Sequence, residues 1–192
     1  MFDLGGVVID FSNDEYYAHL SKVSGVRVRD IKRTIEEKEL GRLERSETDI
    51  RSFERYVGRK LGMRIGEVGW YDFYRRRARA DPDVGELVKE LHKYYTVAFM
   101  SNIDRTRYAY TRKILDLDDF DYRFASCYIG HRKPEPEIFR FAIGRMRIRQ
   151  DEALFIDNML ENVEGARKAG LRALHFTSRR QLDVRLWQMG LY

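Results

Sequence analysis

The chain has 192 residues, of which 43% are hydrophobic and 35% charged, and its formal net charge at pH 7 is +5. That length suits one hydrophobic core with a modest insertion. The small net charge argues against the clustered basic surface of a dedicated nucleic-acid-binding protein, and no apolar run approaches the ~20 residues that cross a bilayer.

The first predicted element is a very short strand that ends in a carboxylate. The opening segment "MFDLGGVVID" places Asp3 behind only Met1 and Phe2, and two glycines, Gly5 and Gly6, follow at once. A strand of about 3 residues is shorter than the usual 5–6. We therefore expect either a natural start farther upstream or a loosely held Asp3.

The next part of the chain has helical patterning and no convincing strand. We expect four helices there, over residues 13–23, 28–40, 48–61 and 65–78. Thr48 is the expected N-cap of the third helix, because a hydroxyl before a staggered apolar set is typical of a helix start. The pattern predicts an all-helical insertion over residues 13–80 and a core domain formed by residues 1–12 and 81–192.

The second half alternates short apolar runs with helical periods. Three runs have the length and the polar boundaries of buried parallel strands, at residues 96–102, 153–158 and 172–176. Helical periods lie between them, at residues 104–115 and 135–146. Strand–helix alternation of this kind predicts an α/β fold with a doubly wound, Rossmann-like parallel sheet.

Polar residues follow the predicted strands where each strand ends. Asp3 follows the first strand, Ser101 and Asn102 follow the second, and Asp157 and Asn158 follow the third. In a doubly wound sheet, ligands collect outside the carboxyl ends of the strands. We therefore expect these side chains to meet in one crevice, together with Lys133 from "GHRKPEPEIF" ahead of a helix.

This set of side chains suits phosphoryl chemistry. An ionised aspartate such as Asp3 can act as a nucleophile and also bind Mg²⁺, which prefers about six hard oxygen ligands. Asp157 and one main-chain carbonyl would add to the metal shell. Lys133 would balance the negative charge, and Ser101 with neighbouring backbone N–H groups would hold phosphate oxygens.

Four segments resemble, in order and spacing, the motifs of haloacid dehalogenase-like hydrolases that carry a helical cap after the first motif. They are "FDLGGVVID", "FMSN", "GHRKPEPEIF" and "FIDNMLENVEGARKAG". The D-x-G form of the first motif, with "GW" at 69–70, is most similar to the bacterial α-glucose-1-phosphate phosphatase branch.

The resemblance implies a role for each matching position. It makes Asp3 the covalent nucleophile and Lys133 a catalytic and phosphate-binding residue, with Ser101, Asn102 and Gly6 also at the phosphate. It places Mg²⁺ at four residues: Asp3, the carbonyl of Gly5, Asp157 and Asn158. The implied activity is a Mg²⁺-dependent phosphatase that hydrolyses a sugar, acyl or aryl phosphate through an aspartyl phosphate.

Two positions depart from the family pattern. Many phosphatases of the family have a second aspartate where this chain has Gly5, and that aspartate protonates the leaving oxygen. Without it we expect good leaving groups to react faster than simple alkyl monoesters. Asn158 stands where the fourth motif usually has a second aspartate, so we also expect weaker Mg²⁺ binding.

Other interpretations stay open from the sequence. Taken singly, Asp3 suits a turn before two glycines, and Asp157 suits an N-cap. A 2-haloacid dehalogenase would use the same aspartate without an acid or a metal, and a binding protein could keep the fold without catalysis. Trp70, Tyr71 and Tyr74 could line a substrate pocket or pack in the core.

The composition also bears on the compartment and the partners. Cys127 is the single cysteine, and the N-terminus shows no basic segment followed by an apolar signal core. We therefore expect a cytoplasmic monomer or homodimer that binds a small phosphorylated metabolite and neither nucleic acid nor membrane. The physiological substrate, the oligomeric state and the pathway stay open.

Overall fold

The sheet at the centre of the molecule is parallel, as predicted. In the computed structural model, which describes residues 1–191, β3 (Ala98–Ser101) pairs with β4 (Tyr122–Ala125), and β5 (Leu154–Asp157) pairs with β6 (Arg172–His175). Phe2 forms parallel bridges to both Phe99 and Ile156. The spatial order is therefore β4, β3, the first segment, β5, β6, which is a doubly wound arrangement.

The first segment is short but held on both sides. Phe2 N donates to the Ala98 carbonyl at 2.8 Å, and Asp3 N donates to the Ile156 carbonyl at 2.8 Å. Phe2 is 2% exposed. Main-chain bonds to two neighbouring strands thus fix the position of Asp3, although only two residues precede it.

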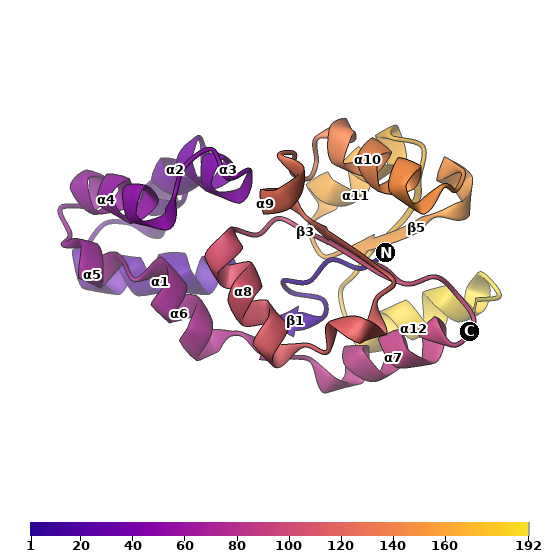
Figure 1. Cartoon of the computed structure of the whole chain (residues 1–192). Coiled ribbons are helices and arrows are strands. Elements are labelled where there is room, and N and C mark those ends of the chain that lie inside the picture. The colour runs from indigo at the N-terminus through magenta and orange to yellow at the C-terminus, as the bar shows by residue number, and fades with distance from the viewer. Residues whose placement is uncertain (192) are drawn as a thin grey trace.

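Helices cover both faces of the sheet (Figure 1). On one face lie α10 (Pro136–Met146) and α11 (Leu160–Lys168), and on the other lie α7 (Pro82–His92) and α12 (Arg179–Gln188). The remaining helical elements within residues 81–191 are α8 (Arg105–Ile114), α9 (Ser126–Ile129) and two 3₁₀ turns at Leu117–Asp119 and Gln150–Glu152. Alternate strand residues face opposite sides, so each face has its own apolar cluster.

The segment that follows the first strand contains six helices, and the prediction of four was wrong. They are α1 (Asn13–Ser24), α2 (Val28–Glu36), α3 (Glu39–Glu44), α4 (Ile50–Leu61), α5 (Ile65–Val68) and α6 (Trp70–Arg77). We call α1 to α6 the helical region. Lys38 leaves helical geometry with φ −144° and Gly69 adopts φ 49°, so each interrupts a predicted helix. The N-cap of α4 is Asp49 instead of Thr48, and its side chain accepts from Ser52 N.

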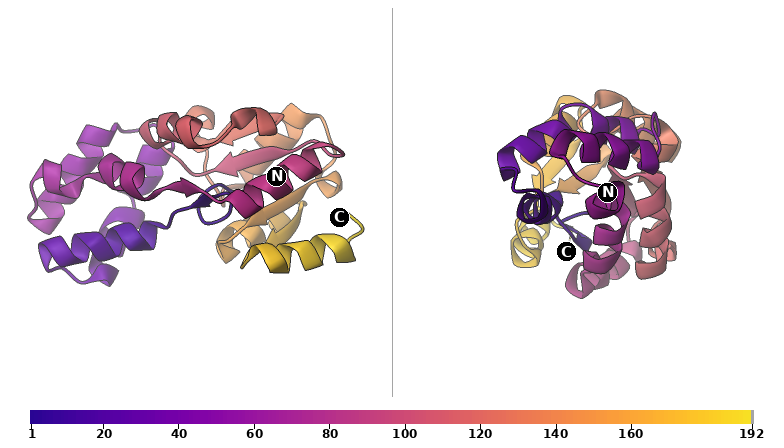
Figure 2. Two further views of the ribbon diagram at one scale, coloured as in Figure 1. Left: turned by 90° about the horizontal axis from the view of Figure 1, so that it is seen from below. Right: turned by 90° about the vertical axis from the view of Figure 1, so that its left-hand side faces the viewer.

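Two chain crossings join the helical region to the sheet. β1 (Ile9–Asp10) pairs antiparallel with β2 (Arg79–Ala80), and Asp81 N donates to the Val8 carbonyl. Figure 2 shows the helical region at one end of the molecule, connected through this ribbon. Among residues 1–191, no helix is both long and apolar enough to span a membrane.

Candidate active site

The carboxyl ends of the strands bring two of the predicted carboxylates to the ammonium group of the predicted lysine. Lys133 Nζ lies 2.7 Å from Asp3 Oδ1 and 2.7 Å from Asp157 Oδ2, and it donates to the Met100 carbonyl at 2.9 Å. These partners use the three N–H bonds of the ammonium group, which is 1% exposed. Residues far apart in the sequence thus form one charged cluster at the edge of the sheet.

Burial and charge act in opposite directions on this cluster. Burial raises the pKa of Asp3 to about 7, although the Lys133 ammonium group opposes that rise. Burial also lowers the pKa of Lys133, but the carboxylates of Asp157 and Asp3 outweigh it and raise the pKa overall. Two carboxylates share one ammonium group, so a further cation would be electrostatically favoured here.

Asp3 has one oxygen engaged and one available. Its Oδ1 accepts from Lys133 Nζ and from Leu4 N at 2.7 Å. Oδ2 has no hydrogen-bond partner among the residues that the structure describes. A cavity of about 420 Å³ opens beside it and is lined by Asp3, Gly5, Ser101, Lys133 and Asn158, among others. Oδ2 is therefore the oxygen of Asp3 that can react with a ligand.

Asn162 holds Asp157 and was missed by the sequence reasoning. Its Nδ2 lies 3.1 and 3.0 Å from the two Asp157 oxygens, and Met159 N donates to Asp157 Oδ1 at 2.7 Å. Asp157 is not the N-cap of α11, because Met159 occupies that position. The first turn of α11 thus returns a side chain to the carboxylate at the end of β5.

Two buried amide oxygens make the site suitable for a hard cation. Asn158 Oδ1 and Asn162 Oδ1 are buried and have no hydrogen-bond partner within residues 1–191. An unpaired buried acceptor is costly, and either a hydrated cation or its water would satisfy it. Together with the carboxylates of Asp3 and Asp157, the donor set consists of oxygens only, which fits Mg²⁺.

Asn102 and Gly6 each form hydrogen bonds that hold the backbone near the cluster. Asn102 Nδ2 donates to the Lys133 carbonyl at 2.8 Å, and Lys133 N donates to Asn102 Oδ1 at 2.8 Å, so this side chain fixes the backbone of Lys133. Gly6 N already donates to the Ile9 carbonyl at 2.7 Å. The Gly6 N–H is therefore engaged within its own turn, whereas the Asn102 amide has a second N–H bond and the residue lines the cavity that contains Asp3. A role of either residue at a phosphate stays a prediction.

We expect Gly6→Ala to destabilise the protein and Gly5→Ala to be tolerated. Gly6 has φ +76°, and a Cβ there would lie 2.3 Å from Asn158 Nδ2, whereas a Cβ on Gly5 meets nothing closer than the Phe11 carbonyl at 3.8 Å. Strain of about 1–3 kcal/mol corresponds to a melting temperature lower by roughly 2–12 °C. Thermal unfolding of both variants checks this, and equal melting temperatures would contradict the close approach of Asn158.

A second charged network lies next to the cluster, and sequence reasoning missed it as well. Arg107 is 3% exposed and donates from Nε to Asp104 Oδ2 at 2.6 Å. Its guanidinium lies 4.4 Å from the centre of the Trp70 ring, and Trp70 Nε1 donates to Asp104 Oδ2 at 3.1 Å. Trp70 is thus a packed residue, while Tyr74, which is also buried, lines the cavity that contains Asp3.

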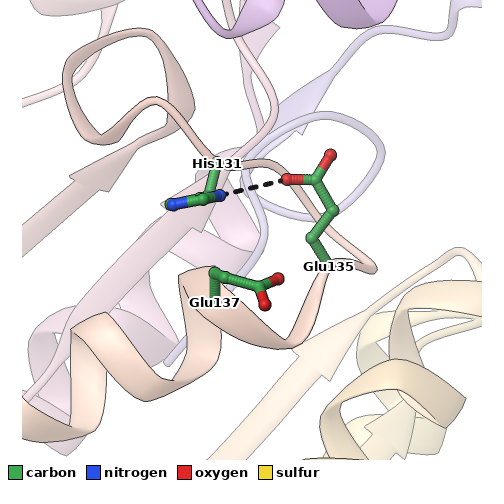
Figure 3. A group of neighbouring side chains, drawn as sticks. All are labelled: His131, Glu135 and Glu137. Carbon is green, nitrogen blue, oxygen red and sulfur yellow. Dashed lines mark ion pairs between the residues drawn. The ribbon is translucent and has the colours of Figure 1, made fainter.

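One surface group of possible metal ligands stands apart from the cluster. His131, Glu135 and Glu137 bring their ligand atoms within 4.8 Å of one another (Figure 3). Glu135 already pairs with Arg45 at 2.8 Å and accepts from Arg132 N at 3.1 Å. Since these contacts satisfy Glu135, we assign no metal to this group.

A further cavity of about 420 Å³, at the amino ends of the strands, has mainly apolar walls.

Comparison with protein families gives one match that spans most of the chain. The family model described as haloacid dehalogenase-like hydrolase matches residues 1–170. A sesquiterpene phosphatase of Aspergillus oryzae is 26% identical over 182 residues, covering 92% of this chain and 88% of that protein. A D-ribitol-5-phosphate phosphatase of Bacteroides thetaiotaomicron is 26% identical over 183 residues, covering 88% and 87%.

Solved structures share the fold. A HAD family enzyme of Bacteroides thetaiotaomicron, in complex with magnesium and inorganic phosphate, aligns with TM-score 0.74 at 20% identity, covering 93% of both chains. The L-2-haloacid dehalogenase of Xanthobacter autotrophicus aligns with TM-score 0.64 at 17% identity, covering 100% of this chain and 82% of that one. At these identities the likeness concerns the fold alone.

Proposed function

The chain belongs to the haloacid dehalogenase-like hydrolases, and on that basis we propose that it is a Mg²⁺-dependent phosphatase acting through an aspartyl phosphate on Asp3. The observation that carries the proposal is the position of Asp3. Its Oδ1 is bound by Lys133 and Leu4 N, while Oδ2 is without a partner among residues 1–191 and borders an open cavity. Two relatives that match most of the chain are named phosphatases.

The reaction would proceed in two in-line steps. Asp3 Oδ2 attacks phosphorus, the leaving oxygen departs, and Asp3 carries the phosphoryl group. Water then attacks that phosphorus and releases phosphate, which returns Asp3 to its carboxylate form. Lys133 stays fixed by Asp157 and the Met100 carbonyl, so its charge is in place throughout. Ser101, at the cavity wall, is our candidate donor to a phosphate oxygen.

The metal would be held beside Asp3 by oxygen ligands. The residues that would hold it are Asp3, Asp157, the Gly5 carbonyl and Asn158, and Asn162 would hold Asp157 in place. When bound, Mg²⁺ supplies positive charge against the phosphate oxygens. The unpaired oxygens of Asn158 and Asn162 support this assignment.

The helical region supplies the other wall of the cavity, and that wall is polar. Lys32 Nζ lies 3.1 Å from Asp14 Oδ1, and Tyr17 OH donates to Glu36 Oε1 at 3.1 Å. The lining residues from this region are mainly polar, with Leu40 and Tyr74 beside Asn13, Asp14, Lys32, Glu36 and Glu44. Such a wall favours a hydrophilic leaving group, so we propose a sugar phosphate or a small acyl or aryl phosphate and not a terpenyl phosphate.

We propose that residues 13–80 are a cap over the core domain formed by residues 1–12 and 81–192. Its closure would exclude bulk water from the aspartyl phosphate and select the substrate. The polar wall of the cavity supports this function for the helical region. A cytoplasmic location and a monomeric or homodimeric state are also part of the proposal.

We expect Gly5→Asp to raise turnover of alkyl phosphates. The chain has no carboxyl group two residues after Asp3, and Asp10 lies exposed on β1. Because a Cβ at Gly5 has room, an aspartate can enter there and protonate the leaving oxygen. A positioned acid is worth ~10²–10⁴ in rate, so glycerol phosphate should gain by about that factor and acetyl phosphate far less. Equal gains on the two substrates would contradict the role of the missing acid.

A substrate panel tests the proposed function. Acetyl phosphate, p-nitrophenyl phosphate, sugar phosphates and a 2-haloacid are incubated with the protein, in Mg²⁺ and in excess chelator. Mg²⁺-dependent phosphate release is the expected result. Halide release in chelator would instead identify a dehalogenase, whose chemistry needs no acid at Gly5, and no turnover of any substrate would indicate a non-catalytic binding protein.

A further inference from the structure

A carboxylate from the helical region is buried among basic groups of the sheet domain. Glu44, at the end of α3, has a side chain that is 2% exposed. Its Oε2 accepts from Arg132 Nε at 2.8 Å, and its Oε1 lies 3.4 Å from Arg107 Nη2. The main-chain carbonyl of Glu44 accepts from Ser126 Oγ at 2.8 Å. One residue of the helical region therefore contacts three separate segments of the core.

Glu44 and Arg107 are buried in this contact, and the Arg132 side chain is 26% exposed. Arg107 is paired with Asp104 of the core and packed against the Trp70 ring of α6, so both the core and the helical region hold its position. Burial works against the charge of Arg107, but the carboxylates of Asp104 and Glu44 outweigh it and raise the pKa. A buried ion with one partner removed is left uncompensated. Separation of the helical region from the core would therefore disturb Arg107 and Arg132 together.

The Glu44–Arg132 contact is adjacent to Lys133 in the sequence. Arg132 immediately precedes Lys133, and Glu135 of the same loop pairs with Arg45, which follows Glu44, at 2.8 Å. On the core side, Asn102 holds the Lys133 backbone through two hydrogen bonds. The loop that carries Lys133 is thus positioned by the core at one residue and by the helical region at the residues on either side.

We propose that Glu44 is a positioning residue that acts through Arg132, so that Lys133 is correctly placed only when the helical region is seated on the core. Arg107 and Arg132 line the same cavity as Asp3. Separation of the helical region from the core breaks the Glu44 contacts, and the Lys133–Asp3–Asp157 cluster is correctly placed once they re-form. This inference rests on the proposed function for its kinetic consequence, but its structural part stands on the contacts alone.

A double-mutant cycle of Glu44→Gln and Arg132→Gln tests the proposal, with p-nitrophenyl phosphate and Mg²⁺ as the assay. Small misplacement of a catalytic group can cost about 10²-fold, so we expect each single variant to lower kcat by roughly 10- to 100-fold, with a smaller change in KM. Because both act on one path, the double variant should be no slower than Arg132→Gln alone. Multiplicative losses, or an unchanged kcat in Glu44→Gln, would overturn the proposal.

Glu37→Gln is the control. Glu37 directly follows α2 in the helical region, is exposed and forms no ion pair within residues 1–191, so the kcat of this variant should stay at the wild-type value. Hydrogen exchange of the amides at 130–135 gives a readout that needs no catalysis. Exchange should be faster in Glu44→Gln than in Glu37→Gln, and equal exchange would overturn the proposal even if the protein hydrolyses no phosphate.

Discussion

Asp3→Asn is expected to abolish turnover of every phosphorylated substrate. The amide retains the shape and one acceptor for Lys133, but it cannot attack phosphorus as a carboxylate does. Loss of a covalent nucleophile costs roughly 10⁴–10⁶ in kcat. Steady-state release of phosphate from acetyl phosphate and from p-nitrophenyl phosphate, with Mg²⁺ present, measures the loss.

Asp10→Asn is the matched control for that experiment. Asp10 is exposed on β1 and lies seven residues from Asp3 in the same opening segment. We expect it to turn over substrate like the wild-type protein. If Asp3→Asn stayed as active as Asp10→Asn while both variants melted at the wild-type temperature, Asp3 would not be the nucleophile.

Lys133→Met is expected to cost both stability and activity. The ammonium group is the shared counter-ion of Asp3 and Asp157, at 2.7 Å from each, and it is almost fully buried. Removing one partner of a buried ion pair typically costs 3–5 kcal/mol, about what we expect here. Chemical denaturation of the wild type and the variant measures the difference, and the same samples should show a large loss of kcat.

The stability loss of Lys133→Met should depend on pH in a definite direction. Burial already raises the pKa of Asp3, and removal of Lys133 takes away the main opposing charge. A carboxyl group with a folded-state pKa above its unfolded value destabilises the fold as pH rises past the unfolded value, about 3.9. The deficit should therefore be larger at pH 8 than at pH 5, since a proton replaces the lysine charge in acid.

An exposed lysine provides the comparison for that measurement. Lys22, in the last turn of α1, is exposed, and Lys22→Met should change the free energy of unfolding little at either pH. A deficit in Lys133→Met that is the same at pH 5 and pH 8 would show that its carboxylate partners do not depend on its charge.

The sequence predicted the part of the site that depends on strand ends. Asp3, Ser101 and Asp157 each follow an apolar run, and the parallel sheet brings those ends to one edge. β4 was missed because Tyr122–Ala125 is only half buried and too short to show a period. The helix boundaries at Lys38 and Gly69 were missed because backbone breaks there override the apolar pattern.

The supporting residues could not be predicted from local pattern. Asn162 contacts Asp157 because the chain turns between β5 and α11, and only the spacing within "FIDNMLEN" hints at it. Glu44 and Arg132 lie 88 residues apart in the sequence, and their pairing depends on how the helical region sits on the core. Such pairs are identified by their burial and their hydrogen bonds, which are known only from the folded structure.

The most direct measurement is chemical trapping of the covalent intermediate. The protein is mixed with acetyl phosphate and Mg²⁺, quenched in acid, reduced with borohydride and mapped by peptide mass spectrometry. The account predicts that the peptide containing Asp3 carries homoserine at that position, the product of reducing an aspartyl phosphate, and that Asp10 is unchanged. Phosphate release at full rate with Asp3 unmodified, or with another residue modified in its place, would contradict it.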